Sequence, residues 1–113
     1  MTGFLQQAVA DKLVVGITFI HDYIQLQFED GAVLNLYNKV DADPVAVLAA
    51  KGKRLRHISL EADKLALEFS DGIVIGMSGP YAAAGPEAAY YHSADRQIMI
   101  VVGQHDFADC GMR

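Results

Sequence analysis

The chain has 113 residues, of which 52% are hydrophobic, and a formal net charge of −5 at pH 7. This length predicts one domain, residues 1–113, and the acidic balance argues against a nucleic-acid partner, which would need a basic surface. We expect no membrane span, because no apolar run approaches roughly 18–20 residues, and no secretory leader, because a basic start and a cleavage pattern are missing. The single cysteine, Cys110, predicts a cytoplasmic setting.

A short amphipathic helix is predicted near the start of the chain. Apolar residues recur at helical spacing over residues 3–11, at Phe4, Leu5, Ala8 and Val9. From Leu13 onward the apolar pattern changes to the two-residue period of strands.

An internal repeat dominates the strand-forming part of the sequence. Residues 12–38 align without a gap on residues 53–79, at an offset of 41 positions. Most apolar positions match in kind, which predicts one strand-rich unit used twice. Identical residues occur at Lys12/Lys53, Ile17/Ile58, Asp22/Asp63, Leu26/Leu67, Phe28/Phe69, Asp30/Asp71, Gly31/Gly72 and Val33/Val74.

Each copy of the repeat contains a hairpin with an Asp-Gly turn. Apolar and polar residues alternate before the turn, as in a strand with one buried face. A three-residue loop that ends at Gly31 pairs Leu26 with Leu34 and keeps one face apolar, whereas a two-residue loop does not. We therefore predict a type I turn with a G1 bulge, with Gly31 and its counterpart Gly72 in the left-handed region.

The remaining segments predict a linker helix and a last hairpin. Between the copies, Asp43 is suited to cap a helix over 43–51 that Pro44 begins and Gly52 ends. After the second copy, a C-terminal hairpin over 87–102 turns at Ser93–Arg96, and a tail over 103–113 lacks periodicity.

The sum is a mainly β chain with about eight short strands and minor helices. Two copies of an antiparallel hairpin or meander, with the C-terminal hairpin, predict a small β-sandwich or a partly open barrel. The pattern leaves these two arrangements open.

Two groups of residues are candidates for binding a ligand or a partner. Arg54 and Arg56 belong to the KGKRLR segment, which suits an anion or an acidic partner, or else is a solvated run of charge. Aromatic and polar residues of the late segment suit a pocket or an interface, although strand tyrosines are more often part of the core. The members of this second group are Tyr81, Glu87, Tyr90, Tyr91 and His92.

We expect neither a metal nor a cofactor. The tail contains His105, Asp106, Asp109 and Cys110, which are weak candidates for metal ligands or a cysteine site, because the spacing of a zinc motif is missing. No phosphate-binding loop, dinucleotide fingerprint or hydrolase motif is present. The sequence therefore predicts no catalytic residue.

The two units LQFEDGAVLNLY and LEFSDGIVIGMS, followed by Gly85–Ala88 before a final hairpin, carry a resemblance. In these features the chain resembles small uncharacterised bacterial β-repeat proteins, a domain of unknown function, over residues 12–102. The resemblance implies a β-repeat fold and a bacterial setting, and it implies no catalytic residue.

The sequence leads to one functional hypothesis and two alternatives. The high apolar fraction and the duplicated hairpins favour a non-catalytic protein-interaction domain that self-associates, with a homodimer favoured and another protein as a further partner. The first alternative is a module that binds a small molecule or an anion. The second is a metal-dependent or cysteine enzyme that uses the residues of the tail.

Overall fold

Eight antiparallel strands form a single sheet in the computed structural model of this chain, which describes residues 2–21, 23–60, 63–79 and 86–107. The strand order is β6-β5-β4-β1-β2-β3-β7-β8, and the sheet is not closed into a barrel over these residues. The described elements are α1 (Thr2–Val9), β1 (Lys12–Ile20), β2 (Tyr23–Phe28), β3 (Val33–Leu36), α2 (Pro44–Leu48), β4 (Arg54–Leu60), β5 (Lys64–Phe69), β6 (Val74–Ser78), β7 (Glu87–His92), β8 (Met99–Gly103) and the 3-10 helix η1 (Gln104–Asp106).

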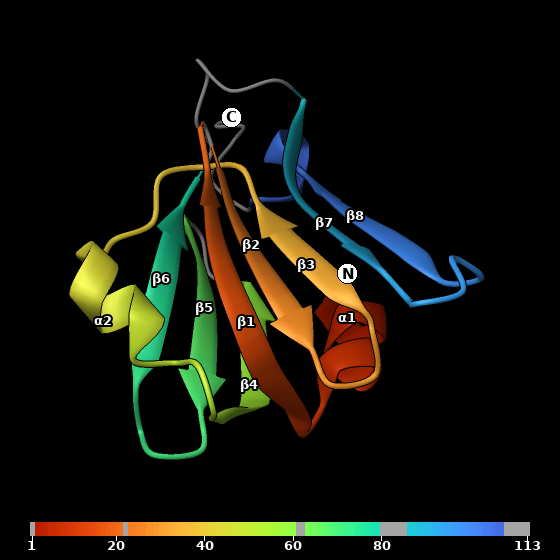
Figure 1. Ribbon diagram of the computed structural model, residues 1–113. Helices are drawn as coiled ribbons and strands as arrows, with labels where there is room; N and C mark the ends of the chain where they lie inside the picture. The colour runs from red at the N-terminus through yellow and green to blue at the C-terminus, as the bar shows by residue number, and fades with distance from the viewer. Residues whose placement is uncertain (1, 22, 61–62, 80–85, 108–113) are drawn as a thin grey trace.

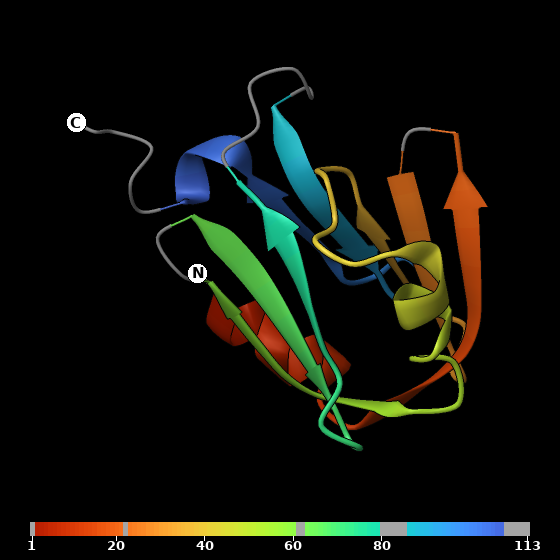
Figure 2. The same cartoon turned by 90° about the vertical axis from the view of Figure 1, so that its left-hand side faces the viewer.

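The sheet bends where β1 and β4 meet (Figure 1). These strands pair through Lys12 with Leu55 and Leu13 with Arg54, after which β1 continues beside β2 and β4 continues beside β5. Figure 2 shows β4–β6 on one side and β1 and β2 on the other, with β7 and β8 in the middle of the view. Because the bend turns the apolar faces of both halves inward, β2, β3, β5 and β6 contribute to one core cluster.

The two tight hairpins have the bulged geometry that the sequence predicts. Gly31 has a φ of +89° and Gly72 a φ of +91°, which glycine adopts without the steric cost of a Cβ atom. The register places Leu26 opposite Leu34, so the apolar side chains of both strands share one face. The predicted turn type is therefore confirmed in both copies.

The two three-stranded units share further details at the 41-residue offset. A bulge separates Val14 from Gly16 in β1, and the equivalent bulge separates Leu55 from His57 in β4. Each unit is a meander in which the first strand pairs with the second and the second with the third. The prediction of a mainly β fold built from two meanders and a C-terminal hairpin is confirmed, with all eight strands in one sheet.

The two helices bury apolar side chains against the bent sheet. α1 contacts both β4 and β8, which are not neighbours in the sheet, and it buries Leu5 and Val9. α2 buries Val47, and its N-terminus is capped by the Asp43 carboxylate, which accepts the Ala46 N–H over 2.8 Å. Among the described residues, no helix is long and apolar enough to cross a membrane.

The structure differs from the sequence predictions mainly at the ends of elements. The helices that the sequence predicts over 3–11 and 43–51 span Thr2–Val9 and Pro44–Leu48. Helix ends depend on which carbonyl and N–H groups find partners, so a pattern of apolar residues locates them less well than helix centres. The C-terminal hairpin is present as β7 and β8, and its turn lies where the sequence places it.

The first part of the predicted irregular tail over 103–113 is regular as far as Phe107. The N–H of Gly103 donates to Asp106 Oδ2 over 2.7 Å, and Phe107 is 1% exposed. The Phe107 ring occupies the space beside Gly79, where an added Cβ would overlap atoms of the ring. A single aromatic anchor has no periodicity, which is why the sequence pattern does not reveal it.

Candidate interaction surface

The tyrosine-rich segment that the sequence marks as a candidate is divided between two faces of the sheet. β7 places Tyr90 and His92 on the outer face, with ring centroids 5.7 Å apart. Tyr91 points into the core and is 2% exposed, and this burial raises the pKa of its hydroxyl. Glu87 is exposed at the start of β7, and Tyr81 lies outside the described residues. The structure thus brings Tyr90 and His92 together and separates them from Tyr91.

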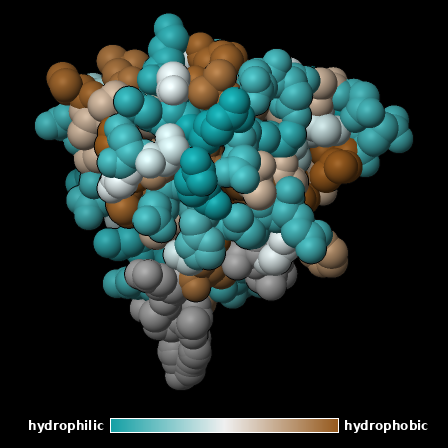
Figure 3. Space-filling view, turned by 90° about the horizontal axis from the view of Figure 1, so that it is seen from below, coloured by the Kyte–Doolittle hydropathy of each residue, from teal (hydrophilic) through white to brown (hydrophobic). Residues whose placement is uncertain are grey.

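The two arginine candidates are engaged with acidic side chains at the end of the molecule where the hairpin turns lie. Arg54 Nη1 lies 3.2 Å from Glu29 Oε2 and donates to the main-chain oxygen of Asp11 over 2.8 Å. Arg56 Nε lies 3.2 Å from the Asp11 carboxylate. Figure 3 looks onto this end of the molecule, and hydrophilic side chains cover most of its centre. Because each guanidinium already has an anionic partner, an external anion would have to compete with a local carboxylate.

Two more ion pairs connect the strand starts with the hairpin turns. Lys12 pairs with Asp30, and 41 positions later Lys53 Nζ lies 3.3 Å from Asp71 Oδ2. Burial alone would raise the pKa of Asp30, but hydrogen bonds, led by that from Lys12, outweigh burial and hold this pKa below its ordinary value. The pKa of Asp71 is lowered first by the hydrogen bond from the Ile73 N–H. The shifted carboxylates therefore belong to turns and not to a cavity.

The candidates for metal ligands do not converge in the described part of the tail. His105 is exposed, and its Nε2 lies 3.5 Å from Asp106 Oδ1. Asp106 also accepts a hydrogen bond from the Gly103 N–H, at the N-terminal end of the 3-10 helix. Across the described residues, no three His, Cys, Asp or Glu side chains form a group that could hold a metal ion. Asp109 and Cys110 lie outside these residues.

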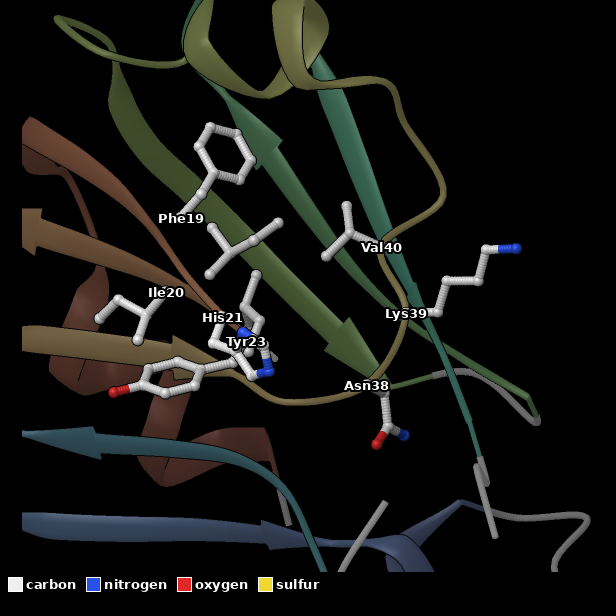
Figure 4. A pocket seen from close by; sticks show the side chains of 9 residues that line it. Phe19, Ile20, His21, Tyr23, Asn38, Lys39 and Val40 are labelled. Atoms are coloured by element: carbon white, nitrogen blue, oxygen red, sulfur yellow. The ribbon is translucent and has the colours of Figure 1, made fainter. Parts of the chain in front are cut away.

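A cleft of about 360 Å³ lies at the far end of β1, between the two halves of the sheet (Figure 4). Its lining is mostly apolar and includes Phe19 and Ile20 of β1, Ile24 of β2 and Val40 after β3. The Tyr23 ring lies at one side, with its hydroxyl pointing away from Phe19 and Val40. This size falls within the range of small-ligand pockets.

Two polar side chains beside this cleft, those of Lys39 and Asn38, are directed elsewhere, whereas the His21 ring belongs to the lining. Figure 4 shows Lys39 extending away from the apolar lining. Asn38 is buried, and its amide nitrogen donates to Ser78 O and to Gln104 Oε1, each over 2.8 Å. The cleft therefore offers mainly apolar contact, with the His21 ring as a polar group in its lining.

A larger groove of about 540 Å³ lies between α1 and the strand β8. Of the nine large hydrophobic side chains that the described residues expose, four line this groove, and the others are divided among β1, α2 and β6. These four are Phe4 (75% exposed), Met99 (60%), Ile98 (51%) and Val101 (42%). Neither α1 nor β8 contains a charged residue. Such an uncharged apolar patch marks a contact surface more often than a random part of the exterior.

β8, which forms one wall of the groove, is also an edge strand of the sheet. The N–H of Ser93 donates to Ile98 O over 2.9 Å, and the register continues with Tyr91 opposite Ile100. Hydrogen-bonded and non-hydrogen-bonded pairs alternate in an antiparallel ladder. The N–H and C=O groups of Met99 and Val101 therefore point away from β7.

The opposite edge of the sheet, β6, is covered by the chain itself. The N–H of Ser78 donates to Lys39 O over 2.8 Å, and the N–H of Asp41 donates to Gly76 O over 2.6 Å. Residues 39–41 thus act as a short extra strand beside β6, with a bridge from Val40 to Met77. Proteins commonly cover or charge an exposed edge in this way. α1 contacts β8, but among the described residues Met99 and Val101 have no main-chain partner on the side away from β7, and β8 contains no charged residue.

A run of apolar residues in the sequence indicates this surface, although it contains none of the polar, charged or aromatic residues that are candidates for a site. Residues 98–102 are five consecutive apolar residues, IMIVV. Successive side chains of a strand point to opposite faces, so a strand with one face in the core must expose apolar side chains on the other. The run therefore indicates a second apolar contact, whereas the sequence candidates lie on β4, on β7 and in the tail.

Comparisons with protein-family models, with curated proteins and with solved structures find no match for this chain. The surfaces described above are therefore the basis on which a function can be proposed. Of these, the groove between α1 and β8 combines exposed apolar side chains with a strand edge whose outward main-chain groups have no main-chain partner among the described residues.

Proposed function

We propose that this chain is a non-catalytic protein-interaction domain that associates with a second copy of itself. The observation that carries the proposal is the uncharged groove beside β8, where four large apolar side chains are exposed. Covering these side chains removes apolar surface from water. This burial contributes a favourable free energy of about 25 cal/mol for each Å² of apolar surface. We propose a cytoplasmic setting, in keeping with the single cysteine of the chain.

The placement of the ionisable groups supports the non-catalytic part of the proposal. Perturbed pKa values often mark catalytic sites in clefts. Here the lowered pKa values belong to Asp30, Asp71 and Asp95, which bind main-chain N–H groups of turns. These carboxylates stabilise turns, and none of the three lines the cleft or the groove.

Sedimentation equilibrium and native mass spectrometry test the proposal. We expect a species of twice the monomer mass of 12.3 kDa to form as protein concentration rises. Because each copy carries a net charge of −5 and the proposed contact is uncharged, added salt should leave the dimer intact or strengthen it. A mass that stays at one monomer over the whole concentration range would contradict self-association.

A second candidate function is the binding of a small apolar molecule in the cleft at the end of β1. The apolar lining contributed by Phe19, Ile24 and Val40 favours it. A thermal-shift screen with hydrophobic and aromatic compounds tests this function, since a ligand that binds the folded state raises Tm with concentration. Loss of the shift on Phe19→Ala would place the ligand in the cleft, and a shift that the substitution leaves unchanged would exclude it from there.

A further inference from the structure

We propose that the partner of the groove is β8 of a second copy, which joins the free edge antiparallel with Ile100 on the two-fold axis. This inference rests on the proposed self-association and assigns its surface, register and symmetry. The pairing would make one sheet continuous across two copies, the mode in which an added strand contributes both main-chain bonds and side-chain contacts.

The direction of the main-chain groups selects the register. Met99 and Val101 are the β8 residues whose N–H and C=O groups point away from β7, as the β7–β8 ladder requires. An antiparallel copy bonds to both when Met99 of one chain lies opposite Val101 of the other. Each of these pairs exchanges two N–H···O bonds, and Ile100 then faces its own equivalent across the axis.

The side chains are consistent with the same register. Met99 and Val101 are 60% and 42% exposed on the outer face of β8, and the pairing brings each against the other in the second copy. Ile100 is half-buried on the inner face, and the second Ile100 would cover it further. Cross-strand contacts between apolar side chains of this kind stabilise sheets.

The charge distribution favours a second copy over a partner chosen by charge. Two chains with a net charge of −5 each associate most easily through an uncharged contact, which places no like charges against one another. α1 and β8 meet this condition, since neither contains a charged residue. A basic partner would find no carboxylate on α1 or β8 with which to pair, and would bind instead to carboxylates elsewhere on the surface. A closed two-fold contact also uses the same patch on both copies, which needs no second kind of surface.

Site-specific disulfide formation tests the register directly. In a Cys110→Ser background, Ile100→Cys places the two thiols in a non-hydrogen-bonded pair, where Cα atoms are about 4.5 Å apart and a disulfide is feasible. Ile98→Cys is the matched control, because in this register the two copies of residue 98 are about 14 Å apart along the strands. We expect mild oxidation to give covalent dimers from Ile100→Cys and few from Ile98→Cys. Equal crosslinking at both positions, or none at Ile100→Cys while the protein is dimeric, would overturn the inference.

A pair of surface substitutions tests the edge without cysteine chemistry. Val101→Lys puts a charge on the proposed contact, a common protection of natural edge strands. Val74→Lys is the matched control: it makes the same change on β6, where the Val74 side chain is 58% exposed. We expect Val101→Lys to weaken dimerisation at least tenfold and Val74→Lys to leave it unchanged, with circular dichroism showing that both fold.

Absence of self-association and association through a different surface give different results in these experiments. A wild-type protein that remains monomeric would contradict both the proposed self-association and this inference. A wild-type dimer that tolerates Val101→Lys as well as it tolerates Val74→Lys would leave self-association standing and exclude β8 as its surface. A monomer that binds an extended peptide at β8, with binding lost in Val101→Lys, would overturn the choice of a second copy.

Discussion

Asp11 and Gly52 occupy equivalent positions 41 residues apart, and both have positive φ, +61° for Asp11 and +87° for Gly52. The N–H of Asp11 donates to Leu55 O, and the N–H of Gly52 donates to Val14 O, each over 2.8 Å. These bonds are equivalent when the two three-stranded units are exchanged. The left-handed residue before each unit thus fixes the point where β1 and β4 meet and the sheet bends.

This relationship predicts the effect of substitutions at Asp11. Asp11→Gly and Asp11→Ala both remove the carboxylate that pairs with Arg56, so they differ in backbone freedom and side-chain size alone. A residue with a Cβ atom in the left-handed region costs about 1 kcal/mol or more. We expect the glycine variant to be more stable than the alanine variant by about 1 kcal/mol in urea denaturation. Equal stability of the two variants would show that the turn tolerates alanine.

Gly52→Ala should destabilise the protein for the same reason. An added Cβ at Gly52 meets no atom within 4 Å, so the expected loss of about 1 kcal/mol comes from the positive φ alone. Gly3→Ala is the control, since its Cβ also meets open space but lies in α1. There alanine should raise the free energy of unfolding by about 0.5 kcal/mol. A loss of stability at Gly3 as large as that at Gly52 would contradict this explanation.

The Gln6 side chain of α1 hydrogen-bonds to main-chain groups of β4 beside its bulge, in the place of a neighbouring strand. Its amide nitrogen donates to Arg56 O over 3.1 Å, and its Oε1 accepts the Ile58 N–H over 2.6 Å. Gln6→Met keeps the length and helix propensity of the side chain but leaves both main-chain groups without this partner. We expect a loss of about 1–2 kcal/mol in thermal or urea unfolding. Faster amide exchange at Ile58 would localise the effect, and unchanged exchange there would contradict it.

Phe107 and Gly79 should behave as a coupled pair. Phe107→Ala removes a ring that is 1% exposed and should cost about 3 kcal/mol. Gly79→Ala brings a Cβ into contact with that ring and should cost about 1–3 kcal/mol. In the double variant the new Cβ enters space that the ring has vacated, so the combined loss should be smaller than the sum. Additive losses in a double-mutant cycle would show that the two residues act independently.

Acid should weaken the second hairpin through Asp71. Its pKa is lowered in the folded state from the ordinary value of 3.8, first by the Ile73 N–H and then by Lys53. A lowered folded-state pKa stabilises the protein above the unfolded pKa, and this contribution is lost as pH falls through the folded value. Asp71→Asn cannot ionise, so its Tm should lie below that of the wild type at pH 7 and approach it below about pH 4. A difference in Tm that stays constant with pH would contradict this origin.

Local chemistry explains why the hairpins are predictable from sequence. Gly31 and Gly72 follow aspartates at turns, and the alternation of apolar residues before them sets which side chains share a face. The capping of α2 by Asp43 is likewise local, because donor and acceptor lie three residues apart. Such features need no knowledge of distant residues, so the predicted turn type and cap agree with the structure.

The sequence by itself therefore determined the mainly β class, the two meanders and their bulged turns, because period and turn chemistry act over a few residues. Only the tertiary structure decided that β7 joins β3, which buries Tyr91 and leaves Tyr90 outside, and that Arg56 finds a carboxylate across the bend. It also decided that α1 lies beside β8 and that β8 is an edge. These outcomes depend on pairings between residues far apart in sequence, which are selected by how the whole chain buries its apolar surface.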